Sequence, residues 1–206
     1  MKSLNLWLWR LACGLYLILN IYAEHSGLFL ISPVLKLELA AGFILLLTLA
    51  VRPMTGRMQY KVWLGLLFVY YLWVLANMLF FDAAFGRDSA AGGVNLTPLH
   101  TIRNYLRAYE NGNIQLKFVV INLLGNVVAF APMAVFLPAF FRGQNNFFVF
   151  VLTILLMVGG VELVQYVTGT GSCDIDDLLL NGAGALAVWL ILLPWRLYQR
   201  YKEAHA

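Results

Sequence analysis

Carboxylate side chains lie at the mouth of a very apolar stretch of the chain. Asp174, Asp176 and Asp177 directly precede a run of leucines. Glu162 lies inside the apolar run before them. Charged groups this close to hydrocarbon are costly and usually mark function. Carboxylates in this position could bind a polar or cationic headgroup, hold a metal ion or transfer a proton.

Polar side chains near these carboxylates recur at intervals of three or four residues, which places each group on one face of a helix. The groups are Glu162 with Gln165, Asn122 with Asn126, and Asp174 with Asp177, Asn181 and Gly184. If the three faces meet, they line a polar pocket. We therefore predict a functional pocket built from these carboxylates and amides, together with Asp176.

Each of these groups also has a purely structural interpretation. Asp174 or Asp176 could cap the helix that follows, because carboxylates complement its free N–H groups. Capping accounts for one aspartate, not for all three. The asparagines could form hydrogen bonds between helices. Glu162 could form a buried ion pair with a cation of the preceding loop, for which the candidates are Arg103, Arg107 and Lys117.

A turn around Pro98 adds Asn95 and His100 to the predicted pocket. His100 could bind a metal or act as a base, but a lone histidine after a proline turn is more often structural. No second histidine is near it, so no zinc site is predicted. The sequence also lacks G-x-S-x-G, H-E-x-x-H, C-x-x-C and phosphate-loop motifs. No catalytic residue is therefore assigned.

The composition is that of an integral membrane protein. Of the 206 residues, 62% are hydrophobic and only 12% are charged, against about 25% charged in a typical soluble domain. The mean hydropathy is +0.78. Positive charges lie beside apolar stretches rather than in a basic tract, so a nucleic-acid partner is not expected.

The apolar stretches predict an all-α bundle of about six transmembrane helices, since a span needs about 20 mostly apolar residues. The six candidates are residues 5–23, 34–51, 61–81, 116–141, 147–168 and 175–196. We treat residues 1–206 as a single transmembrane domain.

Prolines and small residues predict details of the bundle. Pro132 lacks a backbone N–H and should kink the fourth span. Gly159, Gly160, Ala183 and Ala187 are expected to allow close approach of helices.

Lysines and arginines set the expected orientation. With the N-terminus in the cytoplasm, nine of the 14 Lys and Arg residues fall on the inner side. Both termini are then cytoplasmic, and the aspartates lie at the outer face. Glu162 would lie about 9 Å deep, at 1.5 Å per residue. The long outer loop, residues 82–116, should carry a short interfacial helix over residues 99–110.

Three blocks of the chain form a recognisable pattern. They are Asn95-Leu96-Thr97-Pro98-Leu99-His100-Thr101-Ile102, then Asn122 and Asn126 with Phe130, Pro132 and Pro138, then Glu162 and Gln165 followed by Asp174, Asp176, Asp177, Asn181 and Gly184. The pattern resembles the VanZ-like family of bacterial membrane proteins over about residues 94–192. Extra N-terminal spans precede this part. The family usually has an arginine shortly before the first aspartate, where this chain has Ser172 and Cys173.

The resemblance implies an envelope protein of the bacterial cytoplasmic membrane, associated with resistance to the glycopeptide teicoplanin. The expected partner is a membrane lipid, a cell-wall precursor or a lipophilic antibiotic, bound at the outer leaflet. The alternative is an intramembrane enzyme acting on a lipid-linked substrate. In that alternative Glu162 is the acid or base and the three aspartates hold a divalent cation. No other cofactor is predicted, and the sequence does not indicate the oligomeric state.

Overall fold

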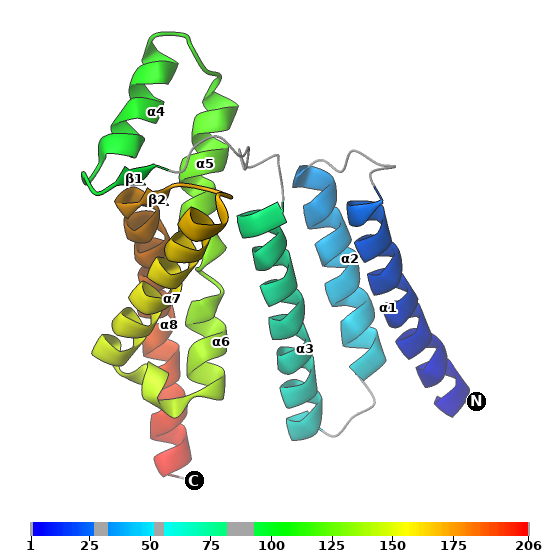
Figure 1. The fold of residues 1–206 in the computed structure, drawn as a ribbon. Coiled ribbons are helices and arrows are strands. Elements are labelled where there is room, and N and C mark those ends of the chain that lie inside the picture. Colours follow the sequence, from blue (N-terminus) through cyan, green and yellow to red (C-terminus); the bar gives the residue numbers. More distant parts are fainter. Residues whose placement is uncertain (1, 27–32, 52–55, 82–92, 206) are drawn as a thin grey trace. The chain divides into compact units, whose positions relative to one another are not determined.

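The computed structural model describes residues 2–26, 33–51, 56–81 and 93–205. The first part of the predicted outer loop, residues 82–92, lies outside the described residues. The elements are helices, apart from one bridge between two strands of two residues each (Figure 1). They form two compact units, Met1–Leu72 and Trp73–Ala206, each of which is described by itself. The prediction of an all-α protein is confirmed, whereas the single domain stays a prediction.

The N-terminal unit packs apolar helix faces together. It contains α1 (Lys2–His25), α2 (Pro33–Val51) and most of α3 (Gly56–Ala76). Cys13, Phe43 and Leu47 lie in its buried core. The ring of Phe43 stacks on Tyr70 with the centroids 4.2 Å apart. Large apolar surfaces of α1 remain exposed, as expected for helices whose solvent is lipid.

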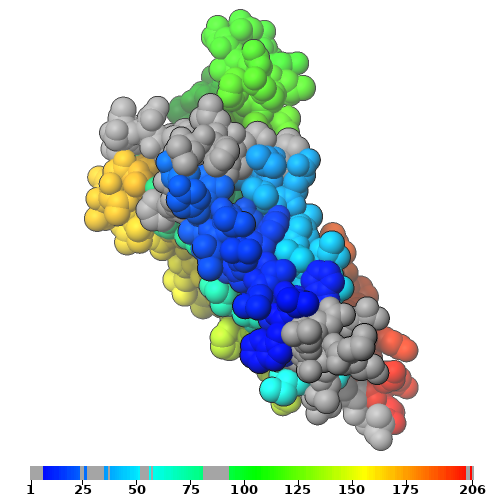
Figure 2. All heavy atoms as spheres, turned by 90° about the vertical axis from the view of Figure 1, so that its right-hand side faces the viewer, coloured from blue at the N-terminus to red at the C-terminus, as the bar shows by residue number. Residues whose placement is uncertain are grey.

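The second unit holds the predicted pocket residues. Its elements follow the end of α3 in chain order. They are η1 (Asn77–Phe81, a π-helix), β1 (Val94–Asn95), α4 (His100–Glu110), α5 (Leu116–Ala129), α6 (Met133–Phe140), η3 (Arg142–Asn145), α7 (Phe147–Thr168), β2 (Cys173–Asp174) and α8 (Ile175–Ala204). The predicted helix over residues 99–110 is therefore present as α4. With the turn after it, α4 forms the green tip at one end of the space-filling view (Figure 2).

Four helical segments within the described residues are long and apolar enough to cross a membrane. They are Met58–Phe80, Leu116–Phe140, Phe147–Thr168 and Ile175–Lys202. The helices α1 and α2 carry shorter apolar stretches, Trp7–Ala23 and Glu38–Val51. The chain is thus a membrane protein with at least these candidate spans. The count of six spans and the cytoplasmic termini stay predictions.

Prolines break the span that runs from Leu116 to Phe140. The helix α5 ends at Ala129, residues 130–132 form a turn, and α6 starts at Met133. Pro132 cannot donate a backbone hydrogen bond, so the turn uses tighter bonds such as Ala131 N to Val128 O at 3.2 Å. The predicted kink at Pro132 is confirmed, in the stronger form of an interrupted helix.

A second proline, Pro138, leaves the carbonyl of Ala134 without its helical donor. Arg196 on α8 supplies one, since its Nη1 donates to Ala134 O at 3.4 Å. The guanidinium also donates to Trp189 O and lies 4.6 Å from the centroid of the Trp189 ring. A charged side chain in α8 thus compensates for a missing backbone donor in α6.

Gly184 sets the closest approach between α5 and α8. A Cβ added to Gly184 would lie 1.7 Å from Val127 O, which no side chain tolerates. The expectation that Gly159 and Gly160 serve this purpose is wrong. Among the described residues, nothing lies within 4 Å of a Cβ added to either. Ala183 and Ala187 are exposed.

The first prediction concerns this helix contact. Gly184→Ala should force α5 and α8 apart and destabilise the protein by about 1–3 kcal/mol, the usual cost of overpacking. Thermal unfolding in detergent measures the change. Gly159→Ala is the matched control and should leave the unfolding midpoint unchanged or raise it, since alanine favours helix. Equal behaviour of the two variants would show that the approach is not tight.

The second prediction couples Pro138 to Arg196. Pro138→Ala restores a backbone N–H for Ala134 O, so the guanidinium is no longer needed there. Arg196→Met should therefore cost less stability in the Pro138→Ala background, by about 0.5–1.5 kcal/mol. A double-mutant cycle of unfolding free energies tests this coupling. Additive effects of the two substitutions would exclude it.

Candidate functional site

A short parallel bridge joins two segments that are distant in sequence. Val94 pairs with Cys173, and Asn95 pairs with Asp174. The N–H of Cys173 also donates to Gly93 O at 3.0 Å. The bridge brings the loop before α4 against the turn between α7 and α8. Asn95 and Asp174, both predicted as pocket residues, thereby become neighbours.

Asp174 caps the start of α8 and holds this loop. Its Oδ1 accepts from the backbone N–H of Asp176 at 2.9 Å and from Asn95 Nδ2 at 3.0 Å. Its Oδ2 accepts from the hydroxyl of Thr101 at 2.5 Å. The side chain is buried. The capping interpretation is therefore correct for Asp174, because both oxygens serve structural hydrogen bonds.

Asp176 caps a different helix, α4, from across the fold. Its Oδ1 accepts from Leu99 N at 2.5 Å, and its Oδ2 accepts from Thr101 N at 2.8 Å and Ile102 N at 3.2 Å. The side chain is 0% exposed. Leu99 has a left-handed backbone, with φ 63°, and offers no side-chain cap of its own. A carboxylate at this helix start satisfies free N–H groups and complements the helix dipole.

Three helices contribute the remaining polar cluster, which we call the Glu162 cluster and define as Glu162, Asp177, Asn126 and Asn181. On α7, the buried Glu162 accepts from the backbone N–H of Asp174 through Oε2 at 3.0 Å. Asn126 on α5 donates to Asp177 Oδ1 on α8. Asn181 Nδ2 donates to Asp177 O at 2.8 Å. These bonds join α5 to α8 and α7 to the start of α8, whereas the pocket that the three faces would line together stays a prediction.

Comparison with known protein families identifies a match to most of this chain. The family model described as VanZ/LLP1 matches residues 68–197. The chain belongs to the VanZ/LLP1 family. No curated protein and no solved structure matches it. The matched range nearly coincides with the second unit, so most of the N-terminal spans precede the family core, as the resemblance indicated.

The glutamine of the VanZ E-x-x-Q motif holds the end of the third span. Gln165 is 1% exposed, and its Nε2 donates to Leu79 O at 2.7 Å. Leu79 lies in the π-helix η1. π-Helical turns are wider than α-helical turns and occur frequently at functional sites. Gln165 therefore binds the backbone of η1 through this bond. Sequence analysis had no signal for Leu79, which is one of many apolar residues in its span.

Two predicted pocket residues form hydrogen bonds within their own helices. Asn122 Nδ2 donates to Phe118 O of its own helix at 2.8 Å. His100 is exposed, and its ring lies within 3.3 Å of Asn104 Nδ2 on the same face of α4. Conversely, sequence analysis missed Thr101 as a contact of Asp174. The threonine of the first VanZ block was the available signal.

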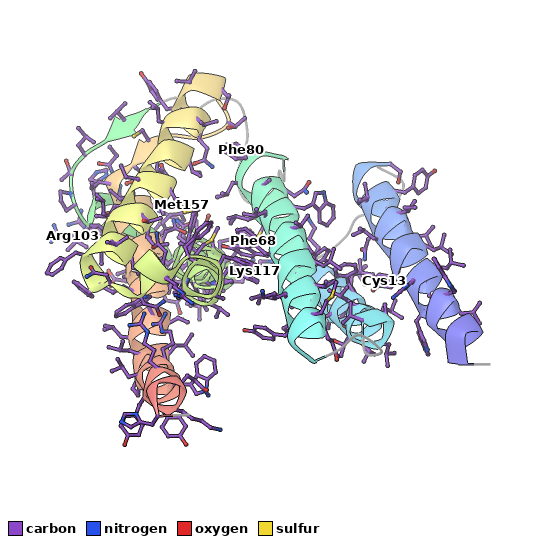
Figure 3. All side chains as sticks on the ribbon, turned by 90° about the horizontal axis from the view of Figure 1, so that it is seen from below. Cys13, Phe68, Phe80, Arg103, Lys117 and Met157 are labelled. Atoms are coloured by element: carbon purple, nitrogen blue, oxygen red, sulfur yellow. The ribbon has the colours of Figure 1, made fainter. Side chains whose placement is uncertain are left out.

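The cations proposed as partners of Glu162 face outward. Arg103, Arg107 and Lys117 are exposed, whereas Glu162 is buried. Arg103 and Lys117 lie well apart when the unit is viewed along its helices (Figure 3). Lys117 Nζ lies 5.0 Å from the centroid of the Phe118 ring on its own helix. Because these three side chains are exposed and Glu162 is buried, their positions do not favour a buried ion pair with Glu162.

Asp174 and Asp176 use their carboxylate oxygens for hydrogen bonds. Every oxygen of Asp174 and Asp176 faces an N–H or O–H donor, and such donors repel a cation. Among the residues that the structure describes, no three His, Cys, Asp or Glu side chains could together hold an ion. The divalent cation of the enzyme alternative stays a prediction that these hydrogen bonds do not support.

The third prediction tests the cap that Asp176 provides. Asp176→Ala leaves three N–H groups without their acceptor, so the protein should lose about 1.5–3 kcal/mol of stability. Hydrogen exchange at Thr101 and Ile102 should accelerate at the same time. Glu110→Ala, at the other end of α4, is the control and should change neither. Unaltered exchange in Asp176→Ala would show that α4 does not depend on this carboxylate.

Proposed function

We propose that this chain is an envelope protein of the bacterial cytoplasmic membrane that binds an amphiphilic ligand at the outer leaflet. The ligand is a lipid headgroup, a cell-wall precursor or a lipophilic glycopeptide. Its capture would alter sensitivity to teicoplanin-type antibiotics. Membership of the VanZ/LLP1 family supports this biological setting.

One observation carries the proposal. The Glu162 cluster consists of two carboxylates and two amides on three apolar helices, and it lies at one end of the unit. Ionisable side chains in such helices cost about 2.5–3.5 kcal/mol on insertion scales, and they are retained mainly for function. Asp174 and Asp176 have evident structural roles. Glu162 and Asp177 are therefore the carboxylates that we assign to ligand binding.

Charge placement supports the outward orientation of this end. The opposite end of the second unit carries Arg142 on η3 and Arg196, Arg200 and Lys202 on α8. Cytoplasmic ends of spans are enriched in lysine and arginine. With that end inside, the Glu162 cluster and α4 lie toward the outer leaflet, where glycopeptides act.

The fourth prediction removes charge without removing a hydrogen-bond acceptor. Glu162→Gln and Asp177→Asn keep an oxygen for Asp174 N and Asn126 Nδ2, so the fold should persist. Expressed in a susceptible bacterium, each variant should lose the increase in teicoplanin resistance that the unaltered chain confers. Inhibitory concentrations measure resistance, and immunoblots of membranes confirm equal protein levels.

Glu110→Gln is the matched control, since Glu110 is an exposed carboxylate on α4. It should retain full resistance. If Glu162→Gln and Asp177→Asn also retained full resistance at equal membrane levels, the Glu162 cluster would not carry the function.

A further inference from the structure

Two arginines on α4 form an exposed pair of cations. Arg103 and Arg107 lie one helical turn apart on the same face, and both side chains are exposed. Neither guanidinium has a hydrogen bond or an ion pair with another residue that the structure describes. Like charges at this spacing repel each other and weaken a helix. An anion in contact with both guanidiniums would remove that repulsion.

Apolar side chains border the arginine pair on the surface of α4. Leu99, Leu106 and Tyr109 are each 44% exposed, although they lie on a helix that is otherwise packed against the unit. Leu106 lies three residues after Arg103, so the two side chains are neighbours on the helix surface. The residues through which α4 packs are half-buried instead. They are Thr101, Ile102, Tyr105 and Ala108. The exposed surface of α4 is therefore amphipathic, with two cations beside hydrocarbon.

Both ends of α4 are attached to the starts of candidate membrane spans. Asp176, the second residue of α8, accepts hydrogen bonds from the backbone of residues 99–102. At the other end, residues 111–115 lead from α4 to Leu116, where the next candidate span begins. The helix runs beside the start of α5 (Figure 1). A span begins where the hydrocarbon meets the headgroup layer, so α4 lies within reach of phospholipid phosphates.

The charges on α4 favour one class of headgroup. A guanidinium binds phosphate oxygens through parallel N–H donors, and such pairs are among the stronger hydrogen bonds in proteins. Phosphatidylcholine carries a cationic nitrogen beside its phosphate, and two arginines repel that nitrogen. Phosphatidylglycerol carries the phosphate charge alone. The exposed carboxylate of Glu110 follows Arg107 by three residues, so the positive charge is greatest between Arg103 and Arg107.

We infer that α4 is a binding site for an anionic phospholipid of the surrounding membrane. The phosphate lies between Arg103 and Arg107, and the acyl chains extend along Leu106 and Tyr109. This site differs from the Glu162 cluster, whose carboxylates would repel a phosphate. Bound lipid would hold α4 at the headgroup layer and, through Asp176, would hold the start of α8 there as well.

Lipid titration of the purified full-length protein in nonionic detergent tests the inference. Short-chain phosphatidylglycerol and phosphatidylcholine are compared, with native mass spectrometry to measure each affinity. Hydrogen exchange of residues 103–110 reports whether the lipid binds at α4. Phosphatidylglycerol should bind more tightly than phosphatidylcholine and should slow exchange in α4. Arg103→Gln and Arg107→Gln should each lower the affinity for phosphatidylglycerol roughly fivefold and leave that for phosphatidylcholine nearly unchanged.

Three variants serve as controls. Arg142→Gln removes an exposed arginine from η3 and should not change the affinity. Glu110→Gln removes a negative charge from α4, so it should bind phosphatidylglycerol at least as tightly as the unaltered protein. Arg103→Lys combined with Arg107→Lys retains both charges and should recover most of the affinity that the glutamine variants lose. Recovery by lysine separates the effect of charge from damage to the helix.

Several results would overturn the lipid site on α4. These are equal affinity for the two lipids, an equal loss in Arg142→Gln, unchanged exchange in α4, and a lysine pair as weak as the glutamine pair. Displacement of phosphatidylglycerol by millimolar inorganic phosphate would show a site for any phosphate rather than for a lipid, and would overturn it too.

The lipid site and the proposed function can fail separately. Glu162→Gln should bind phosphatidylglycerol as tightly as the unaltered protein, because the lipid does not contact the Glu162 cluster. Loss of binding in this variant would place the lipid at that cluster and overturn the site on α4. The resistance phenotype of Glu162→Gln tests the proposed function whatever the affinity of α4 for lipid.

Discussion

The carboxylate of Asp176 at the start of α4 is the contact on which this end of the second unit depends. A charge with no exposed surface is stable only when hydrogen bonds replace its hydration. Here three backbone N–H groups of residues 99–102 do so, in a position that the helix dipole also favours. The strained backbone of Leu99 turns the first of these N–H groups toward the carboxylate. The chain from β1 to α4 is thereby attached to α8.

The acidic residues form two sets that differ in the groups to which their oxygens are bound. Asp174 and Asp176 use their oxygens to hold α4, β1 and the start of α8 together. Glu162 and Asp177 lie on α7 and α8, which are otherwise mainly apolar. Glu162 accepts from the backbone N–H of Asp174, and Asp177 accepts from the side chain of Asn126 on α5. The first set positions the second, because Glu162 is bound to the backbone N–H of Asp174. Loss of the α4 cap would therefore disturb the Glu162 cluster indirectly.

Sequence patterns predicted the features that depend on local properties. Apolar stretches located the helices, Pro132 located the break in the fourth span, and helical spacing grouped Asp177 with Asn181. Features that depend on contacts between distant segments were not accessible. Asp176 and Leu99 are 77 residues apart, and nothing in either neighbourhood specifies the other. Small residues likewise do not reveal which helix face meets a partner, so Gly159 was chosen where Gly184 is the contact.

The unsatisfied atoms of the second unit differ in how readily solvent can satisfy them. In lipid, a polar group has no water to bind and must find a protein or ligand partner. Within the described residues, Gln144 Oε1 and Arg196 Nε lack partners, but both side chains are half-buried near η3, at the end of the unit where the spans reach the interface. Asn181 Oδ1 also lacks a partner within the described residues, and its side chain is only 3% exposed. The side chains that carry these atoms therefore differ in burial, and that of Asn181 is the most deeply buried of the three.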